Sequence, residues 1–114
     1  MPYINAKLTI KLDNEQKEEL QHIFLSLMSD VFNKPTSFVM TNIEDNTELR
    51  MGDKKLEKGA YIEIKLFGNT NKSACNVFSK KICESLDKKY DIASESVYIT
   101  YFPVDLWGWN SQMF

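Results

Sequence analysis

The chain has 114 residues, which is the length of one domain, 1–114. Its charged and apolar shares, 26% and 43%, are those of an ordinary globular protein. A formal net charge of −2 and a single arginine, Arg50, exclude a concentrated basic surface, so we expect no nucleic acid partner.

No stretch approaches the roughly 20 apolar residues of a membrane span, so we expect no membrane insertion. Residues 1–10 are too short and too polar for a signal peptide. We therefore expect a cytoplasmic protein, with secretion by a route that needs no signal peptide as an open alternative. Cys75 and Cys83 lie about 12 Å apart along one predicted helix, too far for a disulfide. No Cys or His cluster has the spacing of metal ligands, and we expect neither a metal nor a cofactor.

The first half of the chain predicts a strand, a helix and a second strand. Residues 2–10 have the apolar pattern of a strand, and proline is tolerated at its first residue. Asp13 and Gln16 form the pattern of a capping box, so a helix begins there and runs to about Phe32. One face of this helix is apolar: Leu20, Ile23, Phe24, Leu27, Met28 and Val31. Pro35 ends the helix, and residues 37–43 form the second strand.

The second half repeats this plan after a polar, turn-rich stretch at 44–59, which has room for a short edge strand around 49–51. Residues 60–67 alternate as a third strand, and 96–102 form a fourth. Between them a second helix is predicted over 72–89. Its buried face consists of Ala74, Val77, Phe78, Ile82 and Leu86. The tail from 103 to 114 is rich in aromatic residues, and its apolar residues follow neither the helical nor the strand period.

Two β-α-β units predict an α+β fold, because each helix is long enough to connect parallel neighbours. We expect a four-stranded mixed sheet with two helices on one face, plus short edge strands. The other face stays open, and Tyr3, Val39 and Tyr61 bring apolar groups to the sheet. We therefore expect oligomers that pack face against face.

Six short segments then carry a resemblance over the whole chain. They are Met1-Pro2, Asn33-Lys34-Pro35, Leu66-Phe67-Gly68, Asn71-Lys72-Ser73, Val97-Tyr98-Ile99, and Gly108-Trp109-Asn110-Ser111 with Phe114. In order and spacing they resemble the macrophage migration inhibitory factor family of the tautomerase superfamily. The resemblance implies a homotrimer that encloses a barrel of sheets, with three active sites between neighbouring subunits.

The resemblance also implies an isomerase, a keto–enol tautomerase of phenylpyruvate, hydroxyphenylpyruvate and dopachrome-type substrates. The implied partner is a small aryl keto acid. Animal members also act as secreted cytokines, so the implied alternative is a signalling ligand that binds a cell-surface receptor of a host and has a vestigial pocket. A trimeric scaffold without any site is a third hypothesis.

Pro2 and Lys34 are the catalytic residues that the resemblance implies. Removal of Met1 would leave Pro2 with a free secondary amine, which can act as a general base if burial and a nearby cation lower its pKa. Lys34 would supply this cation and stabilise the developing enolate. Without the resemblance, Pro2 is simply the first residue of a strand and Lys34 a solvated loop residue.

Five further residues are implied to bind substrate: Phe67, Tyr98, Phe38, Trp109 and Phe114. Tyr98 would reach the pocket from the neighbouring subunit, and backbone groups at Phe67 would also hold the substrate. The other aromatic rings would form a slot for an aryl ring, although such residues are also typical of cores and interfaces. His22, the single histidine, is predicted to be a surface residue.

Two positions and one short segment depart from the family pattern. Phe67 replaces a small aliphatic residue, and Thr100 stands where asparagine is common. The Cys-x-x-Cys motif of some animal members is replaced by the sequence of residues 59–62, Gly-Ala-Tyr-Ile. We therefore expect an altered pocket shape and no thiol exchange.

Overall fold

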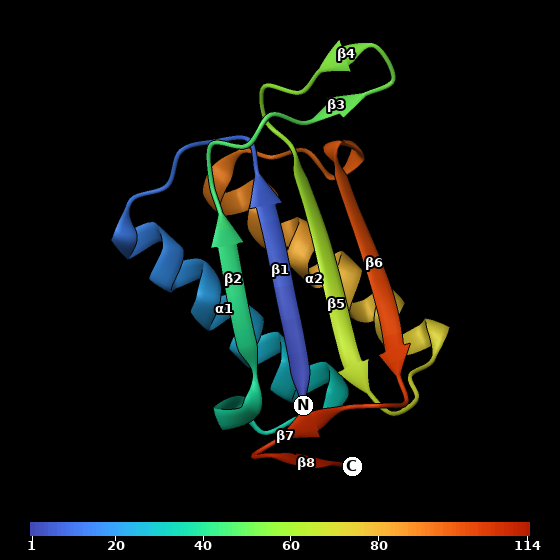
Figure 1. The fold of residues 1–114 in the computed structure, drawn as a ribbon. Helices are drawn as coiled ribbons and strands as arrows, with labels where there is room; N and C mark the ends of the chain where they lie inside the picture. The colour runs from blue at the N-terminus through green and yellow to red at the C-terminus, as the bar shows by residue number, and fades with distance from the viewer.

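The computed structural model describes all 114 residues, and they form a two-layer α+β sandwich (Figure 1). One layer is a four-stranded mixed sheet with the order β2-β1-β5-β6. Strands β1 (Pro2–Leu8) and β5 (Ala60–Phe67) are antiparallel at its centre. At the edges, β2 (Met40–Glu44) runs parallel to β1 and β6 (Val97–Val104) runs parallel to β5. The predicted fold class is confirmed.

Helix α1 (Asn14–Phe32) begins at the predicted capping box. The Gln16 N–H donates to the Asp13 carboxylate over 2.8 Å, and the Asp13 N–H donates to the Gln16 side chain over 3.0 Å. The helix ends where Asn33 adopts the left-handed conformation, with a φ of 55°. Both ends therefore lie within a residue of the sequence-based expectation.

Helix α2 (Lys72–Tyr90) begins where the Asn71 side chain accepts from the Ala74 N–H over 2.8 Å. It buries Phe78, Ile82, Leu86 and Tyr90, which recur every four residues. Val77, which was predicted on this face, is 42% exposed. It lies about 100° around the helix from Phe78, so it faces solvent at the margin of the packed stripe.

The core lies between the sheet and the two helices. Even-numbered positions of the two central strands face the helices and are buried: Ile4, Ala6, Leu8, Ile62, Ile64 and Leu66. They pack against Leu20, Phe24 and Met28 of α1 and against the buried stripe of α2. Neither helix combines the length and the apolar character of a membrane span.

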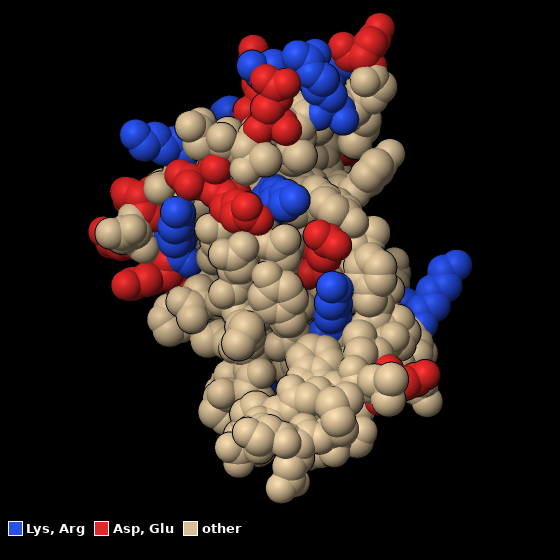
Figure 2. Space-filling model, viewed as in Figure 1, with Lys and Arg blue, Asp and Glu red and all other residues tan.

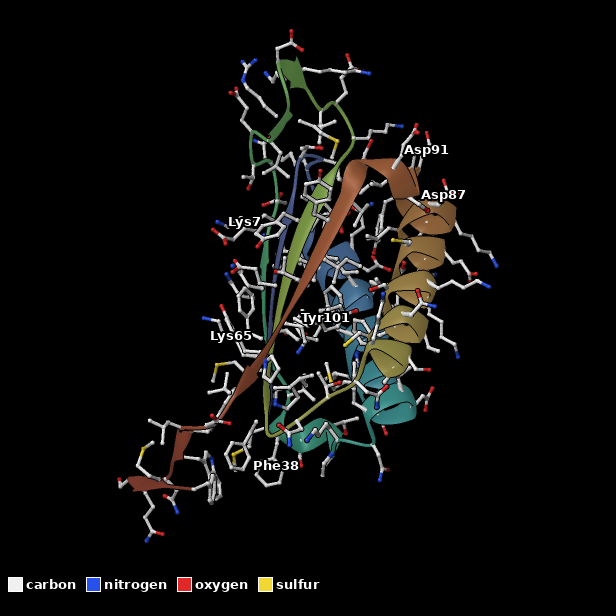
Figure 3. The ribbon with its side chains drawn as sticks, turned by 90° about the vertical axis from the view of Figure 1, so that its right-hand side faces the viewer. Lys7, Phe38, Lys65, Asp87, Asp91 and Tyr101 are labelled. Carbon is white, nitrogen blue, oxygen red and sulfur yellow. The ribbon has the colours of Figure 1, made fainter.

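The opposite face of the sheet is uncovered, as expected, but its middle is polar. Asn42, Asn5, Glu63 and Thr100 form one row across the four strands, and the Asn42 amide donates to Asn5 over 3.0 Å. Lysine side chains of this face point away from the helices (Figure 3). The expected contact between such faces of neighbouring subunits stays a prediction. Of the large exposed apolar side chains, Met40, Tyr98 and Phe102 lie on this face towards its ends. The others are Phe38, Val77, Leu106, Trp109, Met113 and Phe114.

The second strand begins later than predicted. Residues Thr36–Phe38 form a 3₁₀ turn, η1, in which the Phe38 N–H donates to the Pro35 carbonyl over 3.2 Å. Pro35 at the start of this turn has a φ of −60°, which favours a tight turn over immediate strand pairing. Strand β2 therefore starts only at Met40.

Two small hairpins extend the sheet at opposite ends (Figure 1). Strands β3 (Arg50–Met51) and β4 (Lys54–Lys55) form a projecting arm, which includes the predicted edge strand. A second 3₁₀ turn, η2 (Ser94–Ser96), precedes β6. Strands β7 (Gly108–Trp109) and β8 (Gln112–Met113) pair in the C-terminal tail, where no strand was predicted.

Candidate active site

Pro2, Lys34 and Phe67 meet at the end of the sheet where β1 begins and β5 ends. Pro2 is buried and pairs with Leu66 in the antiparallel register of these strands. Lys34 follows the C-terminus of α1, a position that stabilises a cation. Its Nζ atom donates to the carbonyl oxygen of Phe67 over 3.4 Å. Three predicted site residues from distant parts of the sequence therefore lie together.

The α-amine at this end belongs to Met1, and the nitrogen of Pro2 is an amide while Met1 is attached. Burial lowers the pKa of the Met1 α-amine below its ordinary value of 8.0, and the positive charge of Lys34 lowers this pKa further. The Phe67 N–H also donates to the Met1 carbonyl oxygen over 3.1 Å. An amine at this end of the sheet therefore loses its proton at a lower pH than an ordinary α-amine does.

Four aromatic rings form a connected series beside the N-terminus. Phe38 meets Trp109 edge to face with centroids 5.4 Å apart, and Trp109 stacks on Phe114 at 6.2 Å. Phe114 in turn packs on Phe67 at 5.8 Å. In Figure 3 Phe38 lies at the same end of the sheet as the C-terminal hairpin. These are the four residues predicted to form an aryl slot.

A cavity of about 480 Å³ opens next to Pro2, a size that suits a small ligand. Met1, Phe38, Trp107 and Trp109 contribute to its walls. Charged side chains gather near the β3–β4 arm, whereas the C-terminal hairpin at the other end carries none (Figure 2). The cavity has no charged side chain in its lining, and its walls combine apolar and aromatic groups with the polar side chains of Gln21, Ser37 and Thr41.

Tyr98 does not join this group within one chain. In the sheet register Tyr98 pairs with Tyr61, five positions along β5 from Leu66 and Pro2, which corresponds to about 17 Å. Its ring is 63% exposed. A single chain therefore holds the Pro2 part of the predicted site without the predicted tyrosine.

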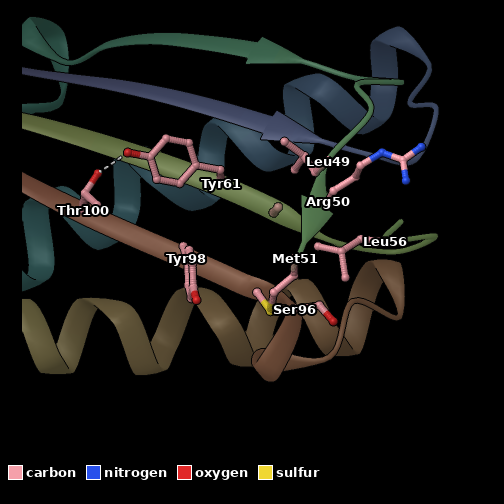
Figure 4. Close-up of a pocket in the computed structure, with 9 residues that line it drawn as sticks. Leu49, Arg50, Met51, Leu56, Tyr61, Ser96, Tyr98 and Thr100 are labelled. Atoms are coloured by element: carbon pink, nitrogen blue, oxygen red, sulfur yellow. Dashed lines mark hydrogen bonds between the residues drawn. The ribbon is translucent and has the colours of Figure 1, made fainter. Parts of the chain in front are cut away.

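Tyr98 instead lines a groove of about 430 Å³ beneath the β3–β4 arm (Figure 4). Met51 and Leu56 form its apolar wall, and the hydroxyls of Tyr61 and Thr100 lie 3.0 Å apart at its other side. The sequence analysis did not identify Tyr61, Met51 or Leu56 as neighbours of Tyr98. Strand alternation alone places Tyr61 and Tyr98 on one face only if the pairing register is known.

The remaining reactive groups do not form a second centre. Cys75 and Cys83 are both free, as the helical spacing predicts. No group of three or more His, Cys, Asp or Glu side chains is arranged to hold a metal ion. His22 is exposed on α1, as predicted.

The fold and this N-terminal cavity define a small two-layer α+β protein with a candidate site at its N-terminus. The family model described as "Macrophage migration inhibitory factor (MIF)" matches residues 1–114, and the chain therefore belongs to this family. No curated protein shows significant sequence similarity to the chain.

Solved structures agree with this assignment at the level of the fold. MIF2 of Leishmania major has 24% identity and a TM-score of 0.91, covering 100% of this chain and 97% of its own. The macrophage migration inhibitory factor-like protein of Entamoeba histolytica has 25% identity and a TM-score of 0.88, covering 99% and 98%. The homologue from Prochlorococcus marinus has 24% identity and a TM-score of 0.87, covering 98% of both chains.

Proposed function

We propose that the protein is a keto–enol tautomerase in which the amine of Pro2 acts as general base after removal of Met1. The observation that carries this proposal is the lowered pKa of the α-amine at this end of the sheet, next to Lys34 and the cavity. Family membership supports a tautomerase or a cytokine-like function in general terms. The substrate class proposed is an aryl keto acid such as phenylpyruvate, hydroxyphenylpyruvate or a dopachrome-type compound.

The proposed mechanism is a proton transfer in two steps. The unprotonated nitrogen of Pro2 takes the proton from the carbon next to the ketone, so that a C–H bond breaks and an N–H bond forms. Lys34 stabilises the negative charge that develops on the enolate oxygen. The same proton then passes from nitrogen to this oxygen, and the enol leaves. The reverse sequence converts the enol to the ketone, and neither direction needs a cofactor.

The proposed assembly is a homotrimer that encloses a barrel of sheets. Family membership implies an oligomer, and the separation of Tyr98 from Pro2 in one chain supports a site shared between neighbours. In this arrangement Tyr98 of one subunit would complete the pocket that contains Pro2 of the next. The exposed ring of Tyr98 is available for such a contact.

The direct test measures ketonisation of enol-phenylpyruvate by protein whose intact mass lacks one methionine. We expect activity in this preparation, loss of activity in Pro2→Gly, and no activity in chains that retain Met1. Full activity in a chain that still carries Met1 would rule out Pro2 as the base.

A second candidate function is a secreted signalling ligand that binds a receptor of a host, which the name of the matching family favours. The two functions can coexist in one protein. Pro2→Gly separates them, since a signal carried by the surface would persist while isomerisation is lost.

A further inference from the structure

The peptide groups of Phe67 contact Lys34 and, while Met1 is attached, the residue before Pro2. The Phe67 N–H donates to the carbonyl oxygen of Met1 over 3.1 Å. The Phe67 carbonyl oxygen accepts from the Lys34 ammonium over 3.4 Å. The Phe67 backbone therefore lies between Lys34 and the start of β1, and its contact with Lys34 is the one that remains after Met1 is removed.

Phe67 is also the last residue of β5, where the pairing between β5 and β6 ends. The next residue, Gly68, has a φ of 90°, which ends the extended conformation. Its N–H donates to Val104 over 3.0 Å as the last backbone bond between β5 and β6. Strand ends of this kind open more readily than strand centres.

The ring of Phe67 provides a second attachment for this strand end. It packs on the ring of Phe114, which stacks on Trp109 of the C-terminal hairpin. The hairpin is itself closed by the Phe114 N–H, which donates to the Trp107 carbonyl over 2.9 Å. A smaller aliphatic side chain at position 67 could not form this ring contact.

We propose that Phe67 is a positioning residue that couples the C-terminal hairpin to Lys34. The contact with the Phe114 ring fixes the Phe67 side chain, and this keeps the Phe67 carbonyl oxygen in place to accept from the Lys34 ammonium. The consequence for catalysis rests on the proposed function, whereas the consequence for the N-terminal amine does not. If Phe114 releases the strand end, Lys34 loses its acceptor and moves away from the amine.

Charged groups on the neighbouring elements are few. Lys34 follows α1, Lys65 lies on β5 next to Leu66, and Asp105 follows β6. Among these, only Lys34 contributes to the lowered pKa of the terminal amine. Lys65 lies over the ring of Phe102, 5.9 Å from its centroid. A displacement of Lys34 should therefore change the pH at which the terminal amine loses its proton.

The experiment compares Phe114→Ala, Phe67→Ala and the double variant in Met1-free protein. The matched control is Met113→Ala, because Met113 is 63% exposed on the same hairpin and belongs to no ring contact. Two quantities are measured against pH: the rate at which an amine-selective reagent modifies the N-terminus, and kcat and KM for enol-phenylpyruvate. Conservative variants, Phe114→Tyr and Phe67→Tyr, test rescue.

We expect Phe114→Ala to move the midpoint of amine modification to higher pH and to lower kcat about 3- to 10-fold, as is typical of coupled neighbours. The double variant should lose no more activity than the less active single variant, because both substitutions break the same ring contact. The tyrosine variants should keep the wild-type midpoint of amine modification, and the Met113→Ala control should retain wild-type behaviour in both measurements.

Two results would overturn the inference. One is a rise in KM with an unmoved amine titration, which is the behaviour of rings that only line a slot. The other is a double variant whose losses multiply. If Met1-free wild type does not ketonise the enol, the proposed function fails, but the amine titrations still decide the role of Phe67.

Discussion

Lys34 has a place in the site that its sequence neighbourhood alone does not reveal. A lysine before a proline in a loop is usually solvated, yet here α1 ends so that the ammonium meets the Phe67 carbonyl oxygen over 3.4 Å. Its charge, after burial, lowers the pKa of the terminal α-amine. If Pro2 becomes that terminus, the same charge will favour the neutral base.

Lys34→Ala in Met1-free protein should therefore change two properties. Turnover should fall by an amount on the order of 10- to 1000-fold, because the enolate loses its stabilising charge. The rising limb of kcat/KM should move to higher pH, because an amine without a neighbouring cation has a higher pKa and becomes neutral later. A pH–rate profile measures both effects.

Lys80→Ala is the matched control, since Lys80 is exposed on α2. It should leave both the turnover and the rising limb of the kcat/KM profile unchanged. If Lys34→Ala reduced turnover while the limb stayed in place, burial alone would determine the pKa of the base.

Several of these residues could be predicted because local chemistry indicates their position. The capping box at Asp13 and Gln16 and the stop at Pro35 place Lys34 directly after α1. Val77 was misplaced because helical spacing does not show how wide the packed stripe is. The surroundings of Tyr98 depend on the register between β5 and β6, which is a long-range property.

Two tyrosine hydroxyls connect the helices to the sheet and to each other. The Tyr101 hydroxyl lies 2.7 Å from the Ser79 hydroxyl and donates to the Cys75 carbonyl over 3.0 Å, so it joins β6 to α2. Figure 3 shows Tyr101 between the sheet and the helices. The Tyr90 hydroxyl donates to the Gln16 carbonyl over 3.2 Å and joins α2 to α1. Burial is the main cause that raises the pKa of each phenol to about 12.

These phenols predict a loss of stability at alkaline pH. Because their pKa is higher in the folded than in the unfolded state, their contribution is complete below pH 10 and is lost as pH rises from about 10 through 12. Tyr101→Phe should lower the free energy of unfolding at neutral pH by about 1 kcal/mol, through the lost hydrogen bonds. Between pH 10 and 12 its stability should fall less steeply than that of the wild type.

Urea denaturation at a series of pH values measures this difference in slope. Tyr98→Phe serves as control, because the exposed Tyr98 ring is not packed between layers. Equal slopes for wild type and Tyr101→Phe would mean that Tyr101 ionises in the folded state as readily as in the unfolded state.

The sequence analysis did not predict the C-terminal hairpin, because its turn lacks the glycine that is usual in such turns. Asn110 and Ser111 have φ values of 52° and 66°, and left-handed pairs of this kind form the two-residue turns that join antiparallel strands. Serine in this conformation costs free energy that glycine does not. A pattern search for Asn-Gly or Asp-Gly therefore does not find this turn.

Ser111→Gly should make the hairpin more stable by roughly 1 kcal/mol, since glycine adopts positive φ without a steric penalty. Hydrogen exchange of the Phe114 amide, which is bonded to Trp107, should slow about 5-fold if that gain is local. The midpoint of global unfolding should change little, because the hairpin lies outside the buried core. Faster exchange in Ser111→Gly would contradict this account of the turn.

The molecule as a whole exposes its large apolar side chains towards the two ends of the sheet, and Met40, Tyr98 and Phe102 among them lie on the open face. Met40 and Trp109 are exposed at the N-terminal cavity, while Tyr98 is exposed near the β3–β4 arm. These two surfaces lie at opposite ends of the sheet, so they cannot contact each other within one chain. A head-to-tail contact that closes into a ring would cover both, which supports the proposed trimer.

Mixed assemblies of two defective chains test this arrangement directly. Pro2→Ala removes the proposed base, and Tyr98→Ala removes the tyrosine; each assembly of one variant should be inactive or nearly so. If Tyr98 serves the site of its neighbour, a site is complete only where a Tyr98→Ala chain provides Pro2 and a Pro2→Ala chain provides Tyr98. In a random one-to-one trimer this occurs at about a quarter of the sites.

Co-refolding the two variants should therefore restore about a quarter of the wild-type rate of enol-phenylpyruvate ketonisation, in a fraction whose mass by light scattering is that of three chains. Mixing the two folded proteins without refolding is the control, since subunits that do not exchange form no mixed sites. Restored activity in the refolded mixture requires that a site draws on two chains. An inactive mixture of trimeric mass would show that Tyr98 acts only within its own subunit, and a light-scattering mass of one chain would remove the trimer altogether.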